Sequence, residues 1–273
     1  MNTNSKISIR KRELRACKRC DFKFDTKCAK CPSCGQWDTP ATLSIVGDET
    51  ILLSDVSDDP IKYIQNTGPW DPCFSQYGGI ATMSVTLIAG APGAGKSTMA
   101  LQMSDRIAEV TKREILYVSA EESKEQVKER AMRLQLKNLS SMRIYPMGAS
   151  TDLGNILLSR KPSAIIVDSL PGLTPDLDQA VELCKRFKEY AVSLNSPVLV
   201  IDHITKDNEF AGLMALQHEV DTTIQFTVLS ATKRDLMTIK NRFGPTRSVI
   251  LNMTERGLIL GLDDEDEVSE EDE

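Results

Sequence analysis

The chain has 273 residues, of which 41% are hydrophobic and 26% are charged. This length and apolar content predict one substantial core with a small accessory module. No run approaches the roughly 18 apolar residues of a membrane span, and the first twenty residues lack the apolar centre of a secretory signal. We therefore expect a soluble, cytoplasmic protein with no membrane partner.

The formal net charge of −6 hides an uneven distribution. The first 34 residues carry ten lysines and arginines against three acidic residues, whereas the last eleven, DDEDEVSEEDE, carry nine acids and no base. A basic N-terminal region can bind phosphate backbones by releasing counterions, although a solvated surface would have the same composition. The acidic tail, residues 263–273, is too charged to fold alone, and a solubilising extension is its simplest interpretation.

Five of the seven cysteines lie between residues 17 and 34. In a chain without a secretion signal, this clustering favours metal binding over disulfides. Residues 1–40 are therefore assigned to a zinc module, in which Cys28 could compete because it forms a third C-x-x-C pair with Cys31. A purely structural role and contact with DNA or a partner both stay open. The pairs CKRC and CPSC, ten residues apart, predict a tetrahedral Zn²⁺ site made by Cys17, Cys20, Cys31 and Cys34.

Residues 41–75 are rich in Asp, Ser, Pro and Gly and are predicted to be an irregular linker. In residues 76–262, short apolar runs then alternate with segments of helical period. Helices are expected at 96–110, 122–136, 151–160 and 176–194, and the strands after residue 220 are expected to extend one edge of a sheet in antiparallel fashion. This alternation predicts an α/β fold with a mostly parallel sheet and helices on both faces. The runs predicted as buried strands are VTLIAG, EILYVS, RIYP, AIIVDS and PVLVID.

The segment GAPGAGKST follows the first of these strands and opens a helix. It matches the phosphate-binding pattern G-x-x-x-x-G-K-[ST] in the strand–loop–helix context that this pattern requires. Its glycines allow successive backbone N–H groups to face phosphate oxygens. Lys96 is expected to reach the β and γ phosphates of ATP, and Ser97 to bind Mg²⁺. The predicted nucleotide site comprises Gly90, Ala91, Pro92, Gly93, Ala94, Gly95, Lys96, Ser97, Thr98 and Asp168.

Hydrolysis also requires carboxylates at the ends of neighbouring strands. Asp168 ends the run AIIVD and is expected to hold Mg²⁺ together with Ser97. Glu121, in YVSAEES, is expected to orient the attacking water. Glu122 could do the same, but a carboxylate at a helix start also stabilises the helix N-terminus, and Glu122 is expected to be structural.

These motifs, in this order, resemble the RadA (Sms) family of DNA repair and recombination proteins, which are RecA-fold P-loop ATPases with an N-terminal four-cysteine zinc finger. The resemblance covers residues 14–262. It implies an oligomeric, hexameric DNA motor with ATPase and helicase-type activity, stimulated by single-stranded or branched DNA, and a recombinase or replication protein as partner. It rests on the cysteine pairs and QWDT, and on GAPGAGKST, YVSAEES, IIVDSL, HITKDNEFAGLMALQHEVD and KNRFGPT.

The resemblance also implies roles for residues that have none from local chemistry. Lys240 and Arg242, in KNRFGPT, would act in trans on the γ-phosphate held by a neighbouring subunit, and their charges have no partner nearby in the sequence. Cationic fingers of this kind raise the hydrolysis rate about 10³- to 10⁵-fold in known NTPases. His203, Thr205 and Lys206 match the family's sensing and DNA-contacting loop, whereas His218 is expected to be structural.

The sequence departs from the family pattern in two places. Residues 170–180 are shorter than the second DNA loop of the family, which argues against DNA contact there. The Lon-protease-like domain is missing, so a hexamer would depend on the ATPase faces and the N-terminal segment. Two alternatives remain: a replicative helicase of the DnaB kind, and a nucleotide-gated DNA-binding or partner-loading module that does not translocate.

Overall fold

The computed structural model describes residues 14–17, 19–20, 23–24, 30–31, 33–35, 40–43, 52–56, 60–146, 153–203 and 211–261. The chain divides into two compact units, Met1–Pro60 and Ile61–Glu273. Among the helices in these described ranges, none is long and apolar enough to cross a membrane. The predicted acidic tail, Cys28, QWDT, Thr205 and Lys206 lie outside the described residues.

The first unit contains a small antiparallel sheet of strand order β2-β1-β3. Its strands are β1 (Leu14–Cys17), β2 (Lys23–Phe24) and β3 (Pro40–Leu43). Strand β1 ends at the first cysteine of CKRC, and a turn follows it. A short 3-10 helix, η1 (Leu53–Asp55), lies further along the same unit.

The second unit is built on a nine-stranded sheet of order β14-β13-β12-β11-β6-β10-β9-β7-β8. From β11 to β8 all neighbouring strands are parallel, and from β11 to β14 all are antiparallel. The predicted α/β fold is therefore confirmed. The strands are β6 (Val85–Gly90), β7 (Ile115–Ser119), β8 (Met142–Tyr145), β9 (Ala164–Asp168), β10 (Val198–His203), β11 (Thr222–Val228), β12 (Lys233–Asn241), β13 (Ser248–Thr254) and β14 (Gly257–Leu260).

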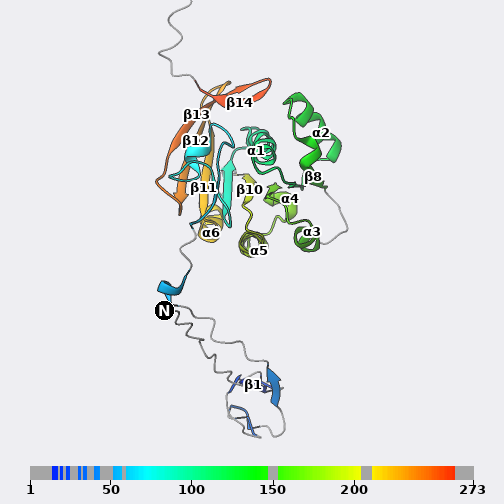
Figure 1. The fold of residues 1–273 in the computed structure, drawn as a ribbon, viewed down its shortest axis with the longest axis vertical. Helices are drawn as coiled ribbons and strands as arrows, with labels where there is room; N and C mark the ends of the chain where they lie inside the picture. The colour runs from blue at the N-terminus through cyan, green and yellow to red at the C-terminus, as the bar shows by residue number, and fades with distance from the viewer. Residues whose placement is uncertain are drawn as a thin grey trace, which may run out of the picture. The chain divides into compact units, whose positions relative to one another are not determined.

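Helices cover both faces of this sheet (Figure 1) and form two separate hydrophobic cores. On one face pack α1 (Lys96–Thr111) and α2 (Lys124–Arg133), and on the other α3 (Leu153–Arg160), α5 (Leu177–Leu194) and α6 (Ala211–Glu219). The central strands β6, β7 and β9 are buried along their whole length. This burial explains why their sequences are continuous apolar runs rather than alternating ones.

The predicted linker differs from the structure in its second half. The boundary between the units falls near residue 60, not near residue 75. Residues 61–81 form β4 (Tyr63–Ile64), η2 (Asp71–Cys73) and β5 (Ile80–Ala81), and Trp70 is only 1% exposed. Thr238 in β12 donates a hydrogen bond of 2.8 Å to the carbonyl of Cys73. This segment is rich in turn-forming residues, but it also contains large apolar side chains that pack in the core of the second unit. Its overall composition does not predict that packing.

A four-residue helix, α4 (Leu170–Leu173), follows β9 and was not predicted. It lies within residues 170–180, where the sequence departs from the pattern of the resembled family. His218, which is expected to be structural, lies in α6.

Candidate nucleotide site and cysteine cluster

The GAPGAGKST loop joins the end of β6 to the start of α1. Gly93 and Gly95 have left-handed φ values of 76° and 111°, which other residues rarely adopt. A Cβ atom at Gly90 would lie 2.4 Å from the carbonyl oxygen of Phe226 in β11, so the neighbouring strand also excludes a side chain. The glycines therefore allow the loop a backbone conformation in which successive N–H groups can bind phosphate oxygens.

Lys96 folds back over this loop. Its Nζ donates hydrogen bonds of 2.7 Å to the Gly90 carbonyl and 2.8 Å to the Ala91 carbonyl, and the residue is 3% exposed. Burial lowers the pKa of Lys96 to about 8, although the nearby carboxylates, Asp168 first among them, favour its charged form. The ammonium is thus poorly solvated, and an anion beside it would be strongly favoured.

Asp168 stands at the end of β9 and is hydrogen-bonded through both carboxylate oxygens. The Ser97 hydroxyl donates to Oδ1 at 3.0 Å, and the Tyr117 hydroxyl donates to Oδ2. Burial raises the pKa of Asp168, and the two hydroxyl donors counteract part of that rise. A hydroxyl oxygen and a carboxylate in direct contact form a hard donor set that fits Mg²⁺.

Glu121 lies just beyond the end of β7, beside the ends of two neighbouring strands. Its Oε1 accepts a hydrogen bond from the Ser169 hydroxyl, and its Oε2 lies 3.3 Å from Nε2 of His203. The peptide between Asp168 and Ser169 is cis. His203 Nδ1 is buried and has no hydrogen-bond partner within the described part of the chain. The structure therefore brings together Glu121 and His203, two of the predicted site residues.

A cavity of about 490 Å³ opens over the loop. Besides Lys96, Ser97, Glu121 and His203, three arginines border it: Arg130, Arg133 and Arg234. Arg130, from α2, forms an ion pair with Glu122, while the cap of α2 is made by Ser123 with Gln126. Glu122 is thus not the capping residue of that helix, although it does lie at its start.

The cations of KNRFGPT have partners in their own chain, although these partners are not close to the motif in the sequence. Lys240 donates hydrogen bonds to the carbonyls of Gln217 and, at 2.8 Å, Val220, at the C-terminal end of α6. Arg242 lies 3.5 Å from Asp221, but its side chain is 56% exposed. Sequence separation concealed these contacts, because the acceptors lie about twenty residues upstream of the motif.

A β-bulge between β11 and β12 turns Lys240 toward α6. Thr223 pairs with Lys240 while Ile224 pairs with Thr238, so Ile239 is an extra residue in β12. Thr238 points to Cys73 on one face of the sheet, whereas Lys240 reaches α6 on the other. In a regular strand, two residues at this spacing would share a face.

The turn after Lys240 packs tightly on the segment before β5. The carbonyl of Phe243 accepts a hydrogen bond of 3.1 Å from the Gln76 amide, and the Phe243 ring meets Tyr63 edge-on. A Cβ at Gly244 would lie 2.5 Å from the Gln76 nitrogen. Asn241 Oδ1 accepts a hydrogen bond from the Phe243 amide and so shapes the turn.

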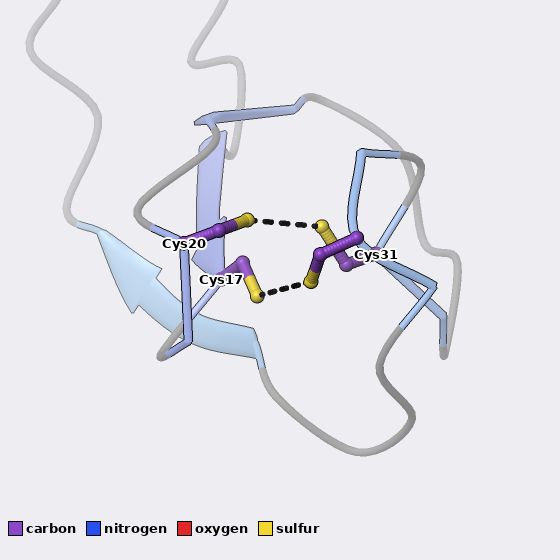
Figure 2. Close-up of side chains that lie close together, drawn as sticks. Cys17, Cys20 and Cys31 are labelled. Atoms are coloured by element: carbon purple, nitrogen blue, oxygen red, sulfur yellow. Dashed lines mark hydrogen bonds between the residues drawn. The ribbon is translucent and has the colours of Figure 1, made fainter.

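In the first unit, the sulfur atoms of Cys17, Cys20, Cys31 and Cys34 all lie within 4.8 Å of one another. Cys17 and Cys34 sulfurs are 3.5 Å apart, and Cys20 and Cys31 sulfurs 3.7 Å. Figure 2 shows the labelled side chains pointing toward one another. Zn–S bonds of about 2.3 Å in a tetrahedron place sulfurs about 3.8 Å apart, so this geometry is compatible with zinc.

Four residues near the nucleotide site were not found from the sequence: Tyr117, Arg130, Arg133 and Arg234. A hydroxyl in the otherwise apolar run EILYVS was a signal for Tyr117. Arg234 gave no signal, because its Nε donates to the backbone carbonyl of Ala94, 140 positions upstream. Every residue has a backbone carbonyl, so the sequence does not indicate which of them accepts a side-chain hydrogen bond.

Comparison with known proteins identifies the family. A family model described as "ATPase: KaiC" matches residues 62–254. Relatives named DNA repair protein RadA are 35% identical in Aquifex aeolicus, 34% in Chlamydia pneumoniae and 30% in Bacillus subtilis, each over 89% of this chain. The chain spans 57–58% of the length of these relatives.

A solved KaiC-like protein from Pyrococcus horikoshii shares the fold, with a TM-score of 0.62 and 14% identity over 74% of this chain and 100% of its own. The predicted RecA-like P-loop fold and the resemblance stated from the motifs are thereby confirmed. The chain therefore belongs to the KaiC family of ATPases, and within that family it is similar to the DNA repair proteins RadA.

Proposed function

We propose that this chain is an oligomeric, DNA-stimulated ATPase of recombination or repair, with each ATP bound between two copies. One copy supplies the phosphate loop, Mg²⁺ ligands and water-orienting carboxylate. The neighbouring copy supplies a cation from KNRFGPT. Movement on single-stranded or branched DNA would then be coupled to hydrolysis at the subunit boundaries.

One observation carries this proposal: the groups needed for phosphoryl transfer converge around a single cavity. Lys96 stands over the glycine loop, Ser97 contacts Asp168 at 3.0 Å, and Glu121 projects from the adjacent strand end. When bound, Mg²⁺ would neutralise developing charge on the phosphates. Ser97 and Asp168 would hold the metal, and Glu121, oriented by the Ser169 hydroxyl, would accept a hydrogen bond from the attacking water.

The arrangement of KNRFGPT favours Arg242 over Lys240 as the residue that acts on the neighbour. Lys240 is bound to two helix carbonyls, and burial lowers its pKa. The Arg242 side chain is more than half exposed, and among the described residues its guanidinium has one partner, Asp221, at 3.5 Å. A planar guanidinium that can leave such a contact suits bidentate binding of a phosphoryl group.

The test is the ATPase rate as a function of protein concentration, with and without single-stranded DNA. A shared site predicts a specific activity that rises steeply with concentration and rises again with DNA. Lys96→Ala should abolish nucleotide use. Arg242→Ala should retain ATP binding and lose turnover about 10³- to 10⁵-fold. Arg256→Ala, an exposed arginine on the β13–β14 turn, is the matched control and should keep full activity.

Mixing the inactive variants separates action in trans from action in cis. A Lys96→Ala copy still offers Arg242, and an Arg242→Ala copy still has an intact loop. Mixed assemblies should therefore recover part of the activity. Full-rate hydrolysis by a dilute, monomeric preparation, or the absence of rescue at every ratio, would refute a shared site.

The proposal extends to DNA and to the cysteine cluster. Binding to single-stranded DNA should weaken as salt rises, because cationic contacts release counterions. Zinc in the four-cysteine cluster would stabilise a module too small for its own apolar core. Strand displacement on a forked DNA would support a motor, whereas ATP-dependent binding without displacement would support a switch.

A further inference from the structure

Arg234 lies near the start of β12, and its guanidinium is buried against the phosphate loop. The residue is 8% exposed. Its Nε donates a hydrogen bond of 2.9 Å to the carbonyl of Ala94, the residue between the two left-handed glycines of the loop. Its Nη1 donates to the carbonyls of Ser230, at 2.8 Å, and Lys233, at 3.0 Å, in the β11–β12 turn. One side chain thus joins the loop to that turn.

The contact with Ala94 fixes the orientation of one peptide plane. The Ala94 carbonyl and the Gly95 N–H belong to the same planar trans peptide, so they point in opposite directions. A carbonyl held toward Arg234 turns the Gly95 N–H away from β12, to the opposite side of the loop. The ψ angle of Ala94 and the φ angle of Gly95 set the orientation of this peptide, and glycine restricts its φ angle less than any other residue does. The loop therefore needs an external contact to hold this N–H in one direction.

The charge of Arg234 strengthens the same effect. Arginine stays protonated in proteins, and the hydrogen bonds of this guanidinium in the described part of the chain all go to backbone carbonyls rather than to a carboxylate. A cation on the Ala94 oxygen polarises the peptide and makes the Gly95 N–H a better donor. Arg234 also borders the 490 Å³ cavity, where its unneutralised charge would attract an anion.

A second strand presses on the loop at the same point. A Cβ at Gly95 would lie 2.4 Å from the terminal methyl group of Met253, in β13. The antiparallel extension of the sheet thus contacts the loop through both Arg234 and Met253. The simpler reading is that Arg234 only holds the β11–β12 turn together through Ser230 and Lys233. The two roles predict different effects on nucleotide affinity.

We propose that Arg234 is a positioning residue for phosphate binding, which orients the Ala94–Gly95 peptide so that its N–H faces the bound phosphates. The inference rests on the nucleotide site proposed above. It assigns the β11–β12 hairpin a part in nucleotide affinity, in addition to its place in the sheet.

The test compares Arg234→Met and Arg234→Lys with wild type in the full chain. ATP and ADP affinities, with Mg²⁺, are measured by titration calorimetry at a temperature where each variant is folded by circular dichroism. Arg234→Met should weaken both nucleotides about 10- to 100-fold, which corresponds to one lost charged hydrogen bond. Arg234→Lys keeps the charge and one donor and should recover part of that loss. Arg256→Met removes a nearby exposed arginine and should bind normally.

Unfolding midpoints without nucleotide separate the two roles. Unchanged nucleotide affinity in a folded Arg234→Met, with or without lower stability, would overturn the proposal and leave Arg234 as a turn-stabilising residue. Should Arg234→Met not fold, Arg234→Lys decides the question, and wild-type affinity in that variant would be the refuting result. A wild-type chain that binds no ATP would instead refute the nucleotide site itself.

Discussion

Nucleotide binding should be coupled to protonation of Lys96. Burial lowers the pKa of this ammonium to about 8 in the nucleotide-free chain. Phosphate oxygens beside Nζ would favour the charged form and raise the pKa back toward that of a free lysine, about 10.4. At pH 9 only about a tenth of the free chains carry the charge, so binding should take up about 0.9 proton. At pH 7 the uptake should fall to about 0.1 proton.

The assay is calorimetric titration of ADP with Mg²⁺ in two buffers of different ionisation enthalpy, at pH 7 and pH 9. The difference in observed enthalpy between buffers gives the number of protons taken up. Because the neutral lysine must be protonated before it binds, affinity should fall about tenfold between pH 7 and pH 9. Lys96→Arg is the control, since arginine does not lose its proton in this range. A proton uptake that is the same at both pH values would refute the assigned environment of Lys96.

The same pKa shift affects stability, with a definite sign. Lys96 has a lower pKa folded than unfolded, so the unfolded chain binds more protons between pH 8 and about 10.4. Its contribution to the free energy of unfolding therefore rises with pH through that window. The full change is roughly 3 kcal/mol, and it should be absent from the stability profile of Lys96→Arg against pH. Urea unfolding at pH 7 to 10 measures it.

Three further substitutions test the packing and the cysteine cluster. Trp70→Ala should lower the free energy of unfolding in urea by about 3–5 kcal/mol, because Trp70 is 1% exposed within the second unit. A decrease below about 1 kcal/mol would instead support the predicted linker. Gly244→Ala should lose about 1–3 kcal/mol, since its Cβ would meet a backbone nitrogen at 2.5 Å, whereas Gly212→Ala, with its nearest contact at 3.9 Å, should not destabilise. Elemental analysis should find less bound zinc in Cys31→Ser than in wild type, whereas Cys184→Ser, which lies outside the cluster, should retain its zinc. Equal zinc content in the two variants would contradict a four-cysteine site.

The parts of the fold that the sequence predicted are those with strong local patterns. The runs VTLIAG and AIIVDS are largely apolar because β6 and β9 are buried on both faces, and their short length and flanking turn residues favour a strand over a buried helix. Strand ends then locate carboxylates, since the carboxyl ends of parallel strands share one edge of the sheet. Asp168 and Glu121 could therefore be placed near the loop from the sequence alone.

The parts that could not be predicted depend on contacts with distant backbone. Lys240 donates to the backbone carbonyl of Val220, and Arg234 donates to that of Ala94. Neither of these contacts is with an acidic side chain, so a charge pattern does not show them. Trp70 stands in a segment whose Gly and Pro residues predict a loop, yet it is buried in the core that lies on the α1 face of the sheet. Burial of this kind is set by tertiary packing, which overrides local composition.

The extra residue in β12 makes the pairing register of this strand a determinant of where Lys240 lies. If β12 paired with β11 without the bulge, Thr238 and Lys240 would share a face, and the lysine would enter the layer that holds Cys73 with no charge altered. Deleting Ile239 would instead leave the lysine directly after Thr238, on the face that α6 covers. The proposed reach of the motif toward another copy thus depends on backbone pairing as much as on residue types.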